Sequence, residues 1–161
     1  MQNLKILNSK ETKHILEKLE EQYGFGSSKG ELDFIFLMNK DNRLYIVSSD
    51  VRLIDLESLK IDSVGMYFGE LYKETIRLSI EGAQLIGKNA TKNFAYINDQ
   101  QMILWVQGND IGFDDTGKNF VIVKYSNHKT GVDDILGCGK YKDGKLINYV
   151  SKSRRLVVVN R

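Results

Sequence analysis

The stretch ILGCGKYKDGKLINYVSKSRRL, residues 135–156, determines how the rest of this sequence is interpreted. It begins as an apolar strand and turns at Asp143-Gly144, a dipeptide that readily adopts the positive φ angles of a tight hairpin. The glycines on either side of Cys138 leave room for close approach of backbone or ligand. From residue 140 to residue 161 there are seven Lys or Arg residues and one acid. The hairpin therefore predicts a surface for a polyanion.

Charge is distributed unevenly over the 161 residues. Residues 1–75 carry ten Lys or Arg against thirteen Asp or Glu, a balance of −3, and residues 76–161 carry thirteen against eight, a balance of +5. This asymmetry predicts two modules, 1–75 and 76–161, the second of which meets the anion.

Several function classes are excluded by composition. One cysteine rules out an internal disulfide, and Cys138 with two isolated histidines gives no recognisable zinc site. No glycine-rich cofactor loop or catalytic pattern is visible. The sequence has no apolar run long enough for a membrane helix, and its polar start is unlike a signal peptide. We expect a cytoplasmic protein with no metal, no cofactor and no membrane contact.

The first module is predicted to place one helix on a small antiparallel sheet. Asn8 followed by Glu11 is typical of a capping box, and the helix should end near Gly24. Residues 32–38 and 43–48 are expected to form a hairpin around a polar turn, and residues 51–56 are a candidate strand that would extend the sheet. Residues 64–68 with 71–72 add another strand.

The second module reads as a small β barrel with two short helices. Strands are expected at residues 76–80, 94–97, 111–113, 120–126, 134–141, 145–150 and 156–159, and helices at residues 81–86 and 100–107. The predicted fold class is therefore α+β, with an α/β module followed by a β pseudo-barrel.

Three segments of the second module resemble a PUA domain, an RNA-binding pseudo-barrel. They are RLSIEGAQLIGKNATKNF at residues 77–94, WVQGNDI at residues 105–111 and the stretch at residues 135–156. More loosely, the first 75 residues are similar to the pre-PUA module of archaeal ribosome-biogenesis proteins. The same pairing resembles the accessory region of Sun/Fmu-type rRNA cytosine methyltransferases.

This resemblance implies RNA binding in a groove between the loop after the first helix of the second module and the neighbouring strands. Where relatives are expected to have proline, this sequence has Lys88 and Ser151. The residues expected to contact RNA are Arg77, Gly87, Lys88, Asn89, Ala90, Thr91, Lys92, Gly137, Gly139, Lys140, Lys152, Arg154 and Arg155. Independently of the resemblance, the fork of arginine suits phosphate oxygens. The rings of Tyr141 and Tyr149 either stack on unpaired bases or, as is more common for tyrosines in strands, pack across the sheet.

Three hypotheses about function follow. The first is an RNA-binding protein of ribosome biogenesis or of rRNA or tRNA modification, without catalytic residues. The second is an adaptor whose acidic first module recruits an RNA-modifying enzyme or a ribosome-assembly protein. The third, ranked last, makes Cys138 a methyl acceptor or nucleophile, which would need a base such as His128.

Overall fold

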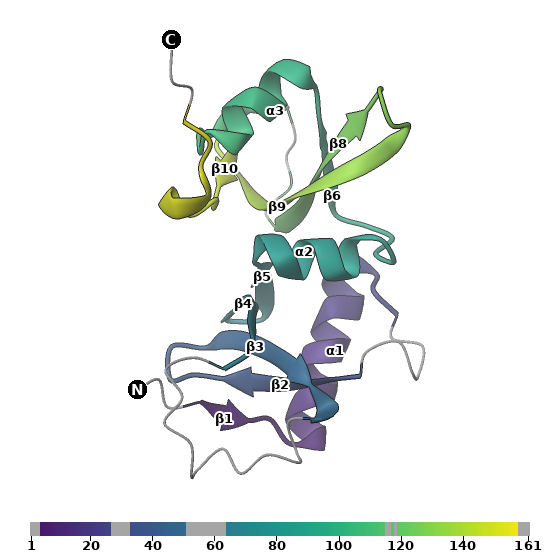
Figure 1. The fold of residues 1–161 in the computed structure, drawn as a ribbon, viewed down its shortest axis with the longest axis vertical. Coiled ribbons are helices and arrows are strands. Elements are labelled where there is room, and N and C mark those ends of the chain that lie inside the picture. Colours follow the sequence, from purple (N-terminus) through teal and green to yellow (C-terminus); the bar gives the residue numbers. More distant parts are fainter. Residues whose placement is uncertain (1–3, 27–32, 51–63, 115–116, 118, 158–161) are drawn as a thin grey trace.

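The structure is a computed structural model, and it describes residues 4–26, 33–50, 64–114, 117 and 119–157. Figure 1 shows two layers of strands stacked on either side of a short central helix. In chain order the elements are β1 (Lys5–Ile6), α1 (Ser9–Tyr23), β2 (Phe34–Met38), β3 (Arg43–Ser48), β4 (Met66–Tyr72), β5 (Thr75–Leu78), α2 (Ile80–Gly87), β6 (Phe94–Ile97), α3 (Asp99–Val106), β7 (Ile111–Gly112), β8 (Phe120–Asn127), β9 (Val132–Lys142), β10 (Lys145–Asn148) and the 3-10 turn η2 (Lys152–Arg154).

The first sheet is antiparallel, in the order β1-β2-β3-β4-β5, with α1 packed on it. The side chain of Asn8 accepts from the backbone N–H of Glu11, and the Glu11 carboxylate accepts from that of Asn8, which confirms the predicted capping box. The helix ends at Gly24 in the left-handed conformation, as predicted. The proposed strand at residues 51–56 lies outside the described residues.

The second sheet has the order β6-β8-β9-β10-β7 and forms the pseudo-barrel. Strand β6 runs parallel to β8, and the other pairs are antiparallel. Asp143 and Gly144 turn β9 into β10 with φ angles of 51° and 72°, which confirms the predicted hairpin. Leu156 and Val157 lie outside any strand, so the last predicted strand is wrong for those two residues. The predicted α+β fold class is confirmed.

The two sheets are joined by a common core. One cluster of buried side chains includes Leu19 and Phe36 from the first sheet and its helix, Ile86 from α2, and Ile122 and Cys138 from the second sheet. A second cluster lies on the opposite face of the pseudo-barrel around the fully buried Trp105 of α3. The predicted division at residues 75 and 76 stays a prediction, and the structure places it at the start of β5, a strand of the first sheet.

Buried polar groups also join α1 to β5, the last strand of the first sheet. The side chain of Gln22 accepts from the backbone N–H of Ile76 at 2.8 Å and donates to its carbonyl at 3.0 Å. The hydroxyl of Tyr23 donates to the same carbonyl at 2.6 Å. Because buried backbone groups that lose their partner cost about 1–3 kcal/mol each, these bonds fix α1 against β5.

Candidate nucleic-acid interface

Helix α2 separates the predicted RNA-contacting residues into two groups. Its amino-terminal end follows β5, which carries Arg77, and its carboxyl-terminal end leads into the loop that contains Lys88 and Lys92. Arg154, near the end of the chain, pairs with Glu81 in the first turn of α2. Glu81 and Lys88 are therefore roughly 10 Å apart along the helix axis. The pairing with Glu81 places Arg154 at the amino-terminal end of α2, the end that follows β5 and Arg77, and not at the loop.

The loop after α2 is attached to the end of α1. The backbone N–H groups of Thr91 and Lys92 both donate to the carbonyl of Tyr23, at 2.9 and 3.2 Å, and the Thr91 hydroxyl donates to the carbonyl of Gly24 at 3.2 Å. These backbone donors are occupied within the protein and cannot also cradle a phosphate. The side chains of Lys88, Lys92 and Asn89 are exposed, and that of Ala90 is half-buried.

The three glycines of the predicted site are buried, and neighbouring side chains of the protein approach them closely. A Cβ atom at Gly87 would lie 2.7 Å from Ile135, and one at Gly139 would lie 2.9 Å from both Trp105 and Leu146. Gly137, with φ of 117°, faces Ile80 of α2. The expectation of open space beside Cys138 is therefore corrected, because the glycines let helices pack on β9.

The carboxyl-terminal basic run, which we call the basic end, consists of Lys152, Arg154 and Arg155. Lys152 and Arg154 are exposed. Arg155 is half-buried, and its side chain packs on Gly108 and donates to the carbonyl of Val150 at 3.1 Å. Arg155 thus fixes this segment to the end of α3, while the side chains of Lys152 and of Arg154, which pairs with Glu81, lie at the surface.

Aromatic rings and cations from both sheets meet beside the start of α2, in a group that we call the ring cluster: Tyr72, Arg77, Phe120, Lys140 and Tyr149. The guanidinium of Arg77 lies 4.7 Å from the centre of the Tyr149 ring, and that ring meets Phe120 edge-on at 5.8 Å. The ammonium of Lys140 lies 5.1 Å from the centre of the Phe120 ring and 5.9 Å from that of Tyr72. Arg77 is held by Glu70, the residue opposite it on β4, at 2.8 Å.

The β9–β10 hairpin extends this surface. Lys140 and Lys142 lie on the face of β9 that also carries Cys138, and Lys145 lies opposite Lys142 on β10. We call Lys140, Lys142, Lys145, Ile147 and Tyr149 the hairpin face, because side chains alternate along the two strands and Tyr141 and Leu146 point to the other core. Tyr141 is therefore an interior residue, not a platform for bases.

Sequence reasoning missed Tyr72, Phe120, Lys142 and Lys145 as parts of this surface. The sequence held a usable signal for the two lysines: alternation places Lys142 on one face of the strand with Lys140, and the two-residue turn at Asp143-Gly144 sets Lys145 opposite Lys142 on that face. Nothing local points to Tyr72, because its neighbours in the ring cluster come from the other sheet.

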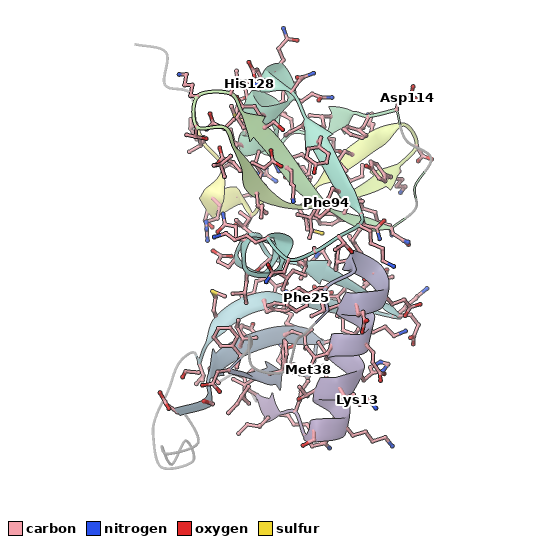
Figure 2. All side chains as sticks on the ribbon, turned by 90° about the vertical axis from the view of Figure 1, so that its right-hand side faces the viewer. Lys13, Phe25, Met38, Phe94, Asp114 and His128 are labelled. Atoms are coloured by element: carbon pink, nitrogen blue, oxygen red, sulfur yellow. The ribbon has the colours of Figure 1, made fainter. Side chains whose placement is uncertain are left out.

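The environment of Cys138 argues against a role as nucleophile or methyl acceptor. Its thiol is fully buried, and burial raises its pKa to about 11, so that the reactive thiolate is scarce at neutral pH. His128 is exposed in the turn between β8 and β9, at the end of the molecule away from the first sheet (Figure 2).

Within the described part of the chain, no group of three or more His, Cys, Asp or Glu side chains is placed to hold a metal ion. Among the helices so described, none is both long enough and apolar enough to cross a bilayer.

Comparison with known proteins relates the second sheet to a family. Residues 92–156 match the family model described as the methyltransferase RsmF PUA domain. This match confirms the resemblance seen in the sequence: residues 92–156 are similar to a PUA domain of the Sun/Fmu type.

Among solved structures, a similar one is the crystal structure of a PUA domain from Aeropyrum pernix K1 in complex with tartrate. It shares 13% sequence identity with this chain, the alignment covers 87% of this chain and 73% of that one, and the TM-score is 0.48. A comparison with curated proteins gave no match.

Proposed function

We propose that this protein binds rRNA or tRNA as a non-catalytic component of RNA modification or ribosome biogenesis in the cytoplasm. The observation that carries the proposal is that Arg77 and Lys140 lie against the paired rings of Tyr149 and Phe120, while Arg154 pairs with Glu81 in the first turn of α2; Lys140, Phe120, Tyr149 and Arg154 belong to the segment that matches a PUA domain. These three cations come from distant parts of the chain.

The proposed interface contacts phosphates with the exposed cations of the basic end and the hairpin face. Arginine presents a planar fork that matches phosphate oxygens, and lysine supplies a mobile point charge. Lys88 and Lys92 form a second contact at the other end of α2, about 10 Å away, which an RNA backbone could reach in a few nucleotides. Gly87, Gly137 and Gly139 support this surface from within by allowing close helix packing.

The salt dependence of RNA affinity tests the proposal. Each phosphate contact on a single strand should add roughly 0.7 to the slope of log affinity against log salt concentration. The double variant Lys152→Ala/Arg154→Ala should weaken binding and lower this slope by roughly 0.7 for each phosphate that is no longer bound. The double variant Lys88→Ala/Lys92→Ala should do the same if the second contact is used.

Lys10→Ala/Lys13→Ala is the matched control. Both lysines are exposed on α1, and Lys13 lies toward the end of α1 that is far from α2 (Figure 2). This control should leave affinity and slope unchanged. Equal effects from the control and from the basic-end variant would show diffuse electrostatic attraction, and absence of any RNA binding at low salt would refute the proposal.

The adaptor function is the second candidate, and one observation favours it. A depression between α1 and the first sheet is lined by the apolar residues Leu7, Ile15, Met38 and Leu71 and by the polar residues Asn8, Lys10, Glu11 and His14. A protein partner bound there should be retained after RNase treatment and lost on His14→Asp, a change at an exposed lining residue. A partner released by RNase would instead be tethered through RNA.

A further inference from the structure

We propose that the ring cluster holds an unpaired base of single-stranded RNA, with one exposed tyrosine supplied by each sheet. This inference rests on the proposed RNA binding and adds the kind of RNA and the place where it is recognised. Tyr72 ends β4 of the first sheet, and Tyr149 follows β10 of the second.

The exposure of the rings is the first argument. Tyr72 is 52% exposed and Tyr149 is 38% exposed, although both rings take part in contacts that join the two sheets. Sites for single-stranded nucleic acid combine such accessible rings, on which bases stack, with cations that follow the backbone. In duplex RNA the base faces are already stacked and unavailable to the rings.

The second argument is the placement of the cations. Arg77 and Lys140 lie within 6 Å of ring centres in the cluster, so a base stacked there would have its phosphates next to positive charge. The guanidinium of Arg77 donates to the carboxylate of Glu70 at 2.8 Å, and this bond fixes the direction of the guanidinium. A nucleotide therefore meets oriented groups rather than mobile ones.

The third argument is a repulsion between like charges on the hairpin face. Lys142 and Lys145 are directly opposite each other on β9 and β10, and both are exposed. Like charges in directly opposed positions destabilise a strand pair. An RNA phosphate bound between them would relieve this repulsion, and Lys140 on the same face continues the positive charge toward the rings.

The experiment measures the affinity of the full chain for a short labelled single-stranded RNA and for the same sequence annealed into a blunt duplex. The single strand should bind more tightly than the duplex. Tyr72→Ala and Tyr149→Ala should each weaken single-strand binding by about 5- to 150-fold, the range found for loss of a base–ring stack. Tyr72→Phe and Tyr149→Phe should keep most of the affinity, because stacking needs the ring and not the hydroxyl.

Tyr96→Ala is the matched control, since Tyr96 is 54% exposed but lies on β6, an edge strand of the second sheet that carries no residue of the ring cluster. It should leave binding unchanged. Thermal unfolding of every variant identifies loss of fold; if Tyr149→Ala does not fold, Tyr72→Ala decides.

Two results would overturn the inference while leaving RNA binding intact: equal affinity for single strand and duplex, or tyrosine variants that behave like Tyr96→Ala. If the unmodified protein binds neither RNA, the proposed function and this inference both fail.

Discussion

The thiol of Cys138 lies in the core between the two sheets, 3.9 Å from the hydroxyl of Tyr23. Its burial, together with its pKa of about 11, turns a residue that looked reactive in the sequence into a packing residue. The two glycines beside it have the same explanation. All three small residues let α2, α3 and the first sheet approach β9 closely.

Cys138 should be unreactive toward a thiol reagent in the native protein at pH 8 and should react fully after unfolding. Its pKa is raised from 9.0, so the folded state keeps the proton longer than the unfolded state does. The free energy of unfolding should therefore fall as the pH rises from about 9 to about 11, and Cys138→Ala should reduce this slope. Rapid labelling under native conditions would contradict the burial argument, and loss of RNA affinity in Cys138→Ala would contradict the proposed interface.

Gly139→Ala tests the packing role of a glycine that was predicted to contact RNA. Its Cβ would lie 2.9 Å from Trp105 and Leu146, so we expect a loss of about 1–3 kcal/mol from overpacking. Gly112→Ala is the control, because no atom lies within 4 Å of its added Cβ and its φ angle is not positive. Denaturant unfolding measures both variants. A neutral Gly139→Ala would mean that β9 has room for a ligand after all.

Helices and strands were the most predictable level of this protein. The capping box at Asn8 and Glu11 and the turn at Asp143-Gly144 depend on local hydrogen bonds and backbone angles, which a short stretch of sequence specifies. The attachment of the loop after α2 to the end of α1 was not predictable, because residues some 70 positions apart make it. The candidate site shows the same limit. Its charges were visible in the sequence, but its rings and its position at one end of α2 depend on how the sheets stack.

Asn93 tests the attachment between the loop and α1. Its side chain donates to the carbonyl of Gln22, and its backbone has a φ of 61°, a conformation that most residues adopt with strain. Asn93→Gly should lose only the hydrogen bond, roughly 0.5–1.5 kcal/mol. Asn93→Ala should lose the bond and add backbone strain, for a larger total of about 1.5–4 kcal/mol. Equal unfolding free energies for the two variants would show that the strain is absent.

Because the two sheets share one buried core, we expect the whole molecule to unfold as one unit. Separating residues 1–78 from residues 79–161 would expose Ile122 and Phe120 on one side and Leu19 and Phe36 on the other. It would also remove the pseudo-barrel that packs next to β5, the strand to which the buried side chain of Gln22 is bonded. Exposed apolar surface of this kind lowers stability and promotes association.

The full chain should therefore unfold in a single cooperative transition, and either half expressed alone should be much less stable than the whole. Circular dichroism during thermal unfolding and the dispersion of amide signals in NMR spectra provide the measurements. A half that unfolds at the same temperature as the full chain would instead support two independent domains with a boundary near residue 75.

The bonds between the loop after α2 and the end of α1, together with the shared core, also limit how this protein can be recombined with others. A chimera that joined this pseudo-barrel to a foreign amino-terminal module would need a helix end whose carbonyls accept from Thr91, Lys92 and Asn93, and apolar side chains matching Ile86, Ile122 and Cys138. Grafting the barrel without them would leave unpaired amides and bare hydrophobic surface. The two modules are thus expected to be inherited, exchanged or transplanted together.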